Sequence, residues 1–277
     1  MIESSDLDAV ILSTPSHLHA SQITQALTNG LHVFCEKPLD TDPAACQQVI
    51  DQQAHHPHLV TMLGFMRRYD PSYQDAKARI DRGDIGRPIL FRAYSVDPEA
   101  AIEEALAYAE HSAGQFLDMA VHDIDLARWM LDSEPCNVLA MGGCYAHPEF
   151  AKHNDGDNVS ALMQFENEAM VFLYAGRTAA HGYQVETEII GTQGALRIAA
   201  TPQANHVEVL DTTGVRRECS QSFLERFGPA YVNELKEFTD CILEKRQPEV
   251  QLHDGLRATE IAVAATKSFH TGKRITL

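Results

Sequence analysis

Several features that mark other classes of protein are scarce or missing in this sequence. The six cysteines form no C-x-x-C pair, and no apolar run reaches the ~20 residues of a membrane-spanning helix. The first residues lack the basic start and the apolar core of a secretory signal. We therefore expect reduced thiols, a cytoplasmic location and no membrane partner.

Basic residues are also few, with 22 Lys and Arg against 39 Asp and Glu, and the net charge is -17. Such a surface repels nucleic acid, so no nucleic-acid partner is expected. The 44% hydrophobic and 22% charged residues are typical of a globular protein. The length of 277 residues suits two modest domains.

The first quarter of the chain alternates between short apolar runs and helical segments. Residues 8–15, 31–35 and 59–65 read as buried strands, and residues 17–29 and 43–54 read as helices between them. This order predicts an α/β fold with a doubly wound parallel sheet of Rossmann type.

The glycine-rich turn of such a sheet is missing, because no G-x-G-x-x-G occurs in the sequence. Residues 1–68 are therefore predicted to be the C-terminal part of a dinucleotide-binding domain that lacks about 60 residues. The expectation is that the protein starts upstream of Met1, or that the chain is a truncated product with weak cofactor affinity.

Residues 69–277 are predicted to form an α+β domain for substrate binding and oligomerisation. Residues 71–82 read as a helix and 89–96 as a strand, and the polar stretch 97–112 suits a mobile segment over a site. The later runs predict a mostly antiparallel open sheet followed by two helices. The expected strands are 138–145, 158–165, 169–177, 183–190, 194–199 and 206–211, and the expected helices are 223–244 and 254–269.

The stretch 114–131, GQFLDMAVHDIDLARWML, is predicted to be a buried helix with a narrow polar stripe. Asp118, His122 and Asp125 fall within roughly 60° of one another at about 100° per residue. Only Asp123 and Arg128 break the apolar surroundings. Carboxylates and a histidine in a cleft are candidates for proton transfer.

Two other interpretations of this stripe remain open. An Asp and a His four residues apart can form a structural hydrogen bond on a solvated face. The same spacing also suits zinc, although no Cys or second His joins the stripe, so no metal is predicted.

Lys37 stands in the turn Glu36-Lys37-Pro38, just past a strand end, where open α/β sheets bind ligands. Pro38 keeps Lys37 out of the helical region, so the ammonium group can be held toward an alcohol oxygen and stabilise negative charge on it. The alternative is a plain surface lysine in a loop.

Four motifs in this order, VFCEKP, GFMRRYDPSY, GQFLDMAVHDIDLARWML and HGYQVETEIIGTQGALRI, strongly resemble the Gfo/Idh/MocA oxidoreductases. Within that family the chain looks most like the inositol 2-dehydrogenases, from about Asp8 to the C-terminus. The resemblance implies an NAD-dependent dehydrogenase, with NADP not excluded, that takes hydride from a secondary alcohol of a polyol such as myo-inositol. It also implies assembly as a homodimer or homotetramer.

The resemblance assigns roles to individual residues. Lys37 would polarise the reacting oxygen next to a Pro38 in cis, Asp118 would bind substrate hydroxyls and His122 would take the hydroxyl proton. The implied cofactor-binding residues are Ser13, Thr14, Pro15, His17, Glu36 and Lys37. The implied substrate-binding residues are Met66, Arg67, Asp118, His122, His181 and Tyr183.

Other residues of these motifs are expected to be structural. Asp125 would orient its neighbours, and Arg68 would pair with Asp70. Two further functions remain as alternatives: a polyol-binding or oligomer-forming relative without turnover, and a metal-dependent hydrolase that uses Asp118, His122 and Asp125. Only the dehydrogenase should gain thermal stability from a dinucleotide.

Overall fold

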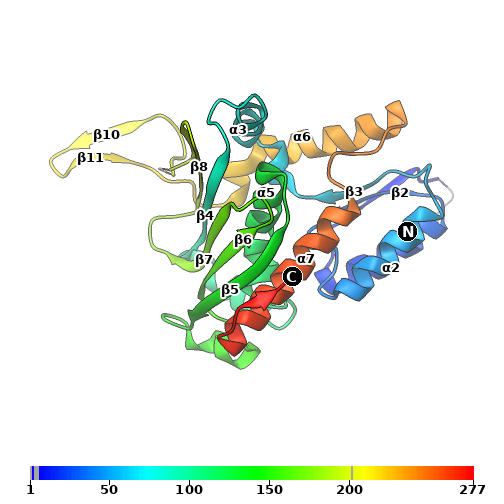
Figure 1. The fold of residues 1–277 in the computed structure, drawn as a ribbon, viewed down its shortest axis with the longest axis horizontal. Helices are drawn as coiled ribbons and strands as arrows, with labels where there is room; N and C mark the ends of the chain where they lie inside the picture. Colours follow the sequence, from blue (N-terminus) through cyan, green and yellow to red (C-terminus); the bar gives the residue numbers. More distant parts are fainter. Residues whose placement is uncertain (1, 3–5, 201) are drawn as a thin grey trace.

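The computed structural model describes residues 2, 6–200 and 202–277, and it begins with a parallel sheet in the order β1-β2-β3. The sheet lies on the right of Figure 1 beside two helices. Its elements are β1 (Ala9–Leu12), α1 (His19–Thr28), β2 (His32–Glu36), α2 (Pro43–Ala54) and β3 (Thr61–Gly64). The predicted alternation of strands and helices is confirmed. Helix α2 begins at Pro43 because Asp42 accepts a hydrogen bond from the backbone N–H of Ala44.

Helix α3 (Pro71–Asp81) begins with a similar cap, since the Asp70 carboxylate accepts hydrogen bonds from the backbone N–H groups of Ser72 and Tyr73. The same carboxylate pairs with Arg226 at 2.9 Å. The predicted pair between Arg68 and Asp70 is therefore wrong, because Asp70 is engaged by the helix it caps and by a helix far along the sequence.

A second sheet has seven strands in the order β12-β5-β6-β7-β4-β8-β9. All neighbours are antiparallel except β4 and β7, so the mostly antiparallel sheet is confirmed. Its strands are β4 (Pro88–Pro98), β5 (Pro135–Gly143), β6 (Asn158–Phe165), β7 (Met170–Ala179), β8 (Gln184–Gly191), β9 (Ala195–Ile198) and β12 (Ile275–Thr276).

One predicted strand of that sheet lies elsewhere. Strand β10 (Glu208–Asp211) pairs with β11 (Gly214–Arg217) in a hairpin of their own, which projects from the sheet in Figure 1. The turn at Asp211 to Gly214 joins the two strands directly.

The polar stretch 97–112 is mostly helical, with a 3-10 turn at Glu99–Ala101 and α4 at Ile102–Tyr108. Tyr108 shares a hydrogen bond of 2.9 Å with Ser16, in the 3-10 turn before α1. The segment is thus attached to the loop that follows β1.

The predicted helix 114–131 consists of a π-helical turn, Phe116–Ala120, followed by α5, Val121–Leu131. The wider π turn shifts Asp118 relative to the α-helical count, and such turns are frequent at functional sites. Asp132 ends the helix in the left-handed conformation with φ 45°.

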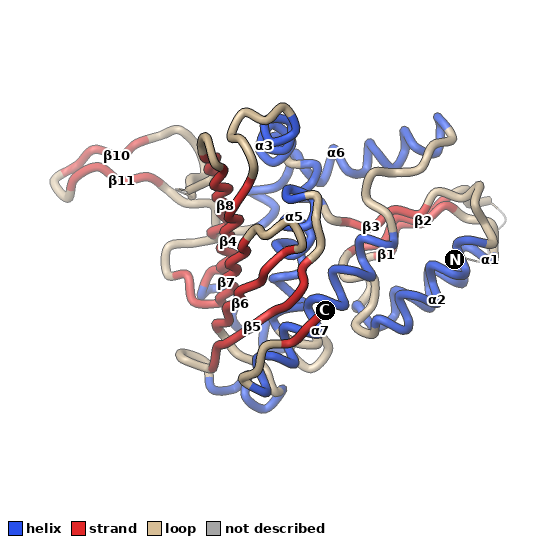
Figure 2. The backbone as a smooth tube through the Cα atoms, in the orientation of Figure 1, coloured by secondary structure: helices blue, strands red, loops and turns tan. Residues whose placement is uncertain are grey.

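The C-terminal helices α6 (Phe223–Glu244) and α7 (Leu252–Thr271) pack across both sheets (Figure 2). At Gly255 the approach is so close that a Cβ atom would lie 2.6 Å from Leu63 and 2.9 Å from Leu39. The two parts of the chain therefore share one hydrophobic core, and the division at residue 68 stays a prediction. No helix among the described residues has the length and hydropathy of a bilayer span.

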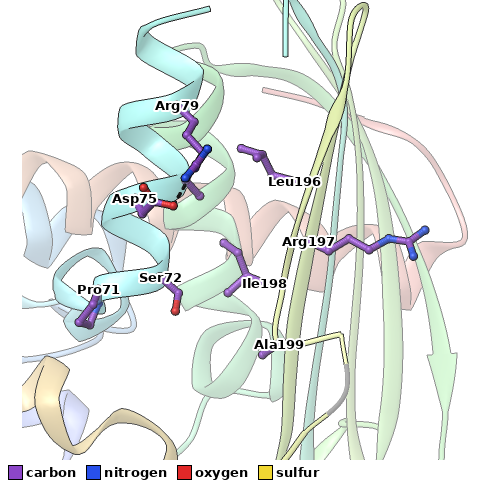
Figure 3. Close-up of a pocket in the computed structure, with 9 residues that line it drawn as sticks. Pro71, Ser72, Asp75, Arg79, Leu196, Arg197, Ile198 and Ala199 are labelled. Carbon is purple, nitrogen blue, oxygen red and sulfur yellow. Dashed lines mark hydrogen bonds and ion pairs between the residues drawn. The ribbon is translucent and has the colours of Figure 1, made fainter. Parts of the chain in front are cut away.

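Helix α3 covers the edge of the second sheet at β9. Figure 3 shows Leu196 and Ile198 pointing toward α3, while Arg197 points to the other side of the sheet. There Arg197 pairs with Glu188 at 2.5 Å. The hollow of about 470 Å³ between α3 and β9 is lined by apolar residues, Ser72, Arg197 and an exposed pair of Arg79 with Asp75. This hollow therefore has none of the features of an active site.

Candidate active site

A cavity of about 500 Å³ lies where the carboxyl end of β2 meets the second sheet and the π turn. It brings together residues that are far apart in the sequence, including Lys37, Asp118 and His122. Its lining residues are Glu36, Lys37, Met66, Arg67, Ser95, Asp97, Asp118, Met119, His122, Tyr183, Phe223, Leu224 and Tyr231.

Lys37 lines this cavity, and its ammonium group is held by a main-chain carbonyl oxygen of the π turn. The peptide bond between Lys37 and Pro38 is cis, as the resemblance implied. The Nζ atom donates a hydrogen bond of 2.6 Å to the main-chain carbonyl oxygen of Asp118. An ammonium group has three donors, so two remain for an oxygen atom in the cavity.

Asp118 faces the cavity from the π turn and pairs with Arg177 of β7 at 2.7 Å. A second carboxyl group, Asp97 at the end of β4, lines the same cavity. Burial, followed by the nearby Asp118 carboxylate, raises the pKa of Asp97 to about 6. Of these two aspartates, Asp118 is ion-paired and Asp97 has a pKa raised to about 6.

His122 lies one turn further along the same helix and is buried, with its ring edge-on to Phe65. Its Nδ1 atom is buried and makes no hydrogen bond with the described part of the chain. Burial, and then the positive charges of Lys37 and Arg67, hold the pKa of His122 well below its usual value. The imidazole is therefore neutral near pH 7 and is able to accept a proton.

Arg67 reaches the cavity from the 3-10 turn after β3 and is fixed by a buried network. Its Nη1 donates to Asp123 at 2.7 Å and to Ser95 at 3.0 Å, and Ser95 donates to Asp123 at 2.6 Å. Asp123, which interrupted the apolar pattern of the predicted helix, thus balances a cation that lines the site. This role could not be seen from one helix alone.

Asp125 does not line the cavity, so the predicted three-residue stripe is wrong in its last member. The Asp125 carboxylate receives two hydrogen bonds from Arg68, at 2.8 and 2.5 Å, on the side of α5 that faces α7. Of the three residues of the stripe, Asp118 and His122 line the cavity and Asp125 does not. The hydrolase that uses all three residues has no basis in this geometry.

Two glutamates are coupled at the cavity, Glu36 in its lining and Glu234 outside the lining. Burial raises the pKa of Glu36, although Lys37 opposes that rise. Glu234 of α6 is buried, and desolvation together with the Glu36 carboxylate raises its pKa to about 9. Glu234 is therefore a neutral acid at pH 7, a group that the sequence pattern did not indicate.

The loop after β1 holds the other predicted cofactor residues, and Ser13, Pro15 and His17 in it are exposed. The buried ring of His19 ties this loop to the lysine turn, with 2.7 Å to the Thr14 carbonyl oxygen and 2.7 Å to that of Pro38. The ends of β1 and β2 thus form one rigid edge beside the cavity. That edge fits the nicotinamide end of a dinucleotide, which binds at the carboxyl ends of such strands.

Two predicted substrate residues of one motif are placed differently. Tyr183 is buried and lines the cavity, whereas His181 is exposed and shares a hydrogen bond with Gln184. Met66 and Arg67 also line the cavity. We therefore retain Tyr183, Met66 and Arg67 as candidates and leave His181 out.

Known proteins with similar sequences share both halves of the chain. Residues 1–64 match the family model described as "Oxidoreductase family, NAD-binding Rossmann fold", and residues 73–197 match the GFO/IDH/MocA C-terminal domain. A scyllo-inositol 2-dehydrogenase (NAD(+)) of Bacillus subtilis is 34% identical over 277 residues, which are 100% of this chain and 80% of the relative.

The chain belongs to the Gfo/Idh/MocA oxidoreductase family. Solved structures agree with this assignment. A scyllo-inositol dehydrogenase of Lactobacillus casei, with bound cofactor NAD(H) and scyllo-inositol, superposes with a TM-score of 0.96 at 42% identity and covers 100% of this chain and 82% of its own. A myo-inositol 2-dehydrogenase of Lactobacillus plantarum gives 0.98 at 37% identity, with coverage of 100% and 82%.

Membership of the Gfo/Idh/MocA family agrees with the residues that the sequence indicated, but several groups in the cavity had no sequence signal. Asp97 stands in the polar stretch that was predicted to be mobile, and Arg177 is the last residue of the predicted strand 169–177, for which no site role was predicted. The groups that the sequence analysis missed are Ser95, Asp97, Asp123, Arg177, Tyr231 and Glu234.

Proposed function

We propose that this chain is an NAD-dependent inositol dehydrogenase that oxidises one secondary alcohol of scyllo- or myo-inositol to a ketone. The observation that carries the proposal is the convergence of Lys37, Asp118 and His122 on one cavity beside the Rossmann sheet. The printed activities of the similar proteins support the substrate class.

The roles follow from the charges in the cavity. Lys37 donates a hydrogen bond to the reacting oxygen and stabilises negative charge that develops there. His122, kept neutral by burial, accepts the hydroxyl proton as the C–H bond breaks. The nicotinamide of bound NAD supplies the hydride acceptor.

The remaining polar groups suit a substrate with many hydroxyl groups. Asp118 and Asp97 offer acceptors, and Arg67 and Tyr183 offer donors, on different walls of one cavity. A hydroxyl-rich ring needs several convergent polar partners of both kinds. A cavity of about 500 Å³ also falls within the usual range for a small-molecule site.

We also propose that the protein is a homodimer or homotetramer in the cytoplasm. The face of the second sheet turned away from the helices exposes Met141, Leu162 and Met170. Exposed apolar side chains gathered on one sheet are typical of an interface between subunits.

Thermal unfolding with and without NAD tests the cofactor assignment. A ligand present at a hundredfold excess over its Kd adds about 2.7 kcal/mol to the stability of the folded state. We expect millimolar NAD to raise Tm by several degrees, and a parallel titration with NADP compares the two cofactors. No shift with either cofactor would favour a polyol-binding protein without turnover.

A further inference from the structure

Arg177 is a buried cation at the back of the cavity that the reaction described above does not use. It stands near the end of β7, is 1% exposed, and its guanidinium lies 4.7 Å from the centre of the Phe150 ring. A charge in such a place is costly unless it is paired and fully hydrogen-bonded.

The pairing of Arg177 leaves two of its three nitrogen atoms without a partner among the described residues, whereas Arg67 and Arg92 each leave only Nε so. Its Nη2 donates to Asp118 Oδ2 at 2.7 Å, but its buried Nε and Nη1 make no hydrogen bond with the described residues. Arg68, by contrast, uses Nε and Nη2 together on Asp125 and also reaches Asp254. A buried arginine that breaks the rule of full satisfaction is expected where function requires it.

We propose that Arg177 is a positioning residue that holds the Asp118 carboxylate toward the cavity, leaving Oδ1 to accept a hydroxyl group of the substrate. In the described part of the chain Oδ1 accepts no hydrogen bond, and the Asp118 side chain is 26% exposed, on the cavity side. The inference rests on the proposed function, because it names which oxygen receives the polyol.

Arg177 also lowers the pKa of Asp97, the second aspartate that lines the cavity. Burial and Asp118 raise the pKa of Asp97, whereas Arg177, Lys37 and Arg67 each lower it. Arg177 belongs to β7, Lys37 to the turn after β2, Arg67 to the turn after β3 and Asp118 to the π turn. The other titratable groups that line the cavity are Glu36, His122, Tyr183 and Tyr231.

Replacing Arg177 by methionine removes the cation while keeping a long apolar side chain against Phe150. We expect kcat/KM for inositol to fall about tenfold or more, mostly through KM, because a charge-assisted contact that orients the acceptor is lost. In a plot of kcat/KM against pH, the limb that reflects ionisation of Asp97 should move to higher pH by about one unit, because the positive charge that lowers the pKa of Asp97 is lost. Arg177→Lys keeps the charge and should leave that limb close to the parent's.

The matched control is Arg128→Met, which removes a buried arginine of α5 that pairs outside the cavity with Glu134 at 2.5 Å and with Asp254 at 3.4 Å. It should lower Tm to a similar extent and leave KM and the pH profile unchanged. If Arg177→Met lowers Tm alone, with KM and the pH profile of the parent, then Arg177 is only structural and the inference is wrong.

A crystal structure of Arg177→Met separates this inference from the proposed function. A parent that oxidises no inositol would overturn the proposed function, while the orientation of Asp118 in the variant would still test the inference. We expect the Asp118 carboxylate to rotate or to take a new partner. An unchanged carboxylate orientation would overturn the positioning role.

Discussion

Replacing Lys37 by methionine is expected to lower kcat for inositol oxidation by about a hundredfold to a thousandfold, which is the usual cost of removing a group that stabilises charge on oxygen. The ammonium group is held by a hydrogen bond of 2.6 Å to the Asp118 carbonyl oxygen. It can therefore act without reorganisation. Steady-state kinetics with NAD and inositol measures the loss.

The control for this variant is Lys77→Met, which removes a lysine paired with Asp81 on the surface of α3. It should leave kcat unchanged, because an exposed pair on a helix contributes little. Both variants should keep the Tm of the parent within a few degrees. A Lys37→Met variant with activity close to the parent's would show that Lys37 has no role in catalysis.

Replacing His122 by asparagine is expected to lower kcat about a hundredfold or more, as the loss of a general base does. The residue is buried beside Phe65, so asparagine leaves a polar group without the basic nitrogen. Kinetics at a series of pH values measures the effect. A rate close to the parent's would leave His122 with a structural role only.

The same substitution has a second expected effect, on stability. The folded protein keeps the pKa of His122 well below its usual value of 6.5, so the unfolded chain binds the proton more readily. Stability contributed by the neutral ring is therefore present above about pH 6.5 and is lost as pH falls below it. Between pH 7 and 5, Tm of the parent should fall more steeply than Tm of His122→Asn.

Much of the fold follows from local sequence signals. The helices 43–54 and 223–244 were predicted with the bounds that the structure gives, and in the structure Asp42 and Ser222 cap their first turns. The hairpin of β10 and β11 was not predicted, because the pattern of residues 206–211 indicates a strand but not the strand with which it pairs.

The proximity of site residues could be predicted where the residues belong to the same motif. Lys37 and Pro38 share a turn, and Asp118 and His122 share a helix, so their proximity could be inferred from spacing. The partners of Asp118 and Arg67 could not, since Arg177 and Asp123 lie 59 and 56 residues away along the chain. Only tertiary packing brings those charges together, and periodicity carries no information about it.

The predicted stripe was partly wrong because helical spacing shows which residues share a face, and not which partners their side chains meet. His122 and Asp125 both lie in α5, three residues apart, so the π turn before α5 does not change their spacing. Asp125 is absent from the cavity because its carboxylate receives two hydrogen bonds from Arg68, whereas His122 lines the cavity. Arg68 lies 57 residues away along the chain, and the charge pattern of one helix does not indicate such a partner.

The most direct test of the central claim is whether the chain transfers hydride from inositol to NAD. The measurement follows NADH absorbance with scyllo- and myo-inositol, and then repeats the assay with an inositol deuterated at the reacting carbon. We predict NADH formation that depends on enzyme concentration, together with deuterium in the nicotinamide. No NADH with either isomer, in a folded protein whose Tm rises with NAD, would contradict the account.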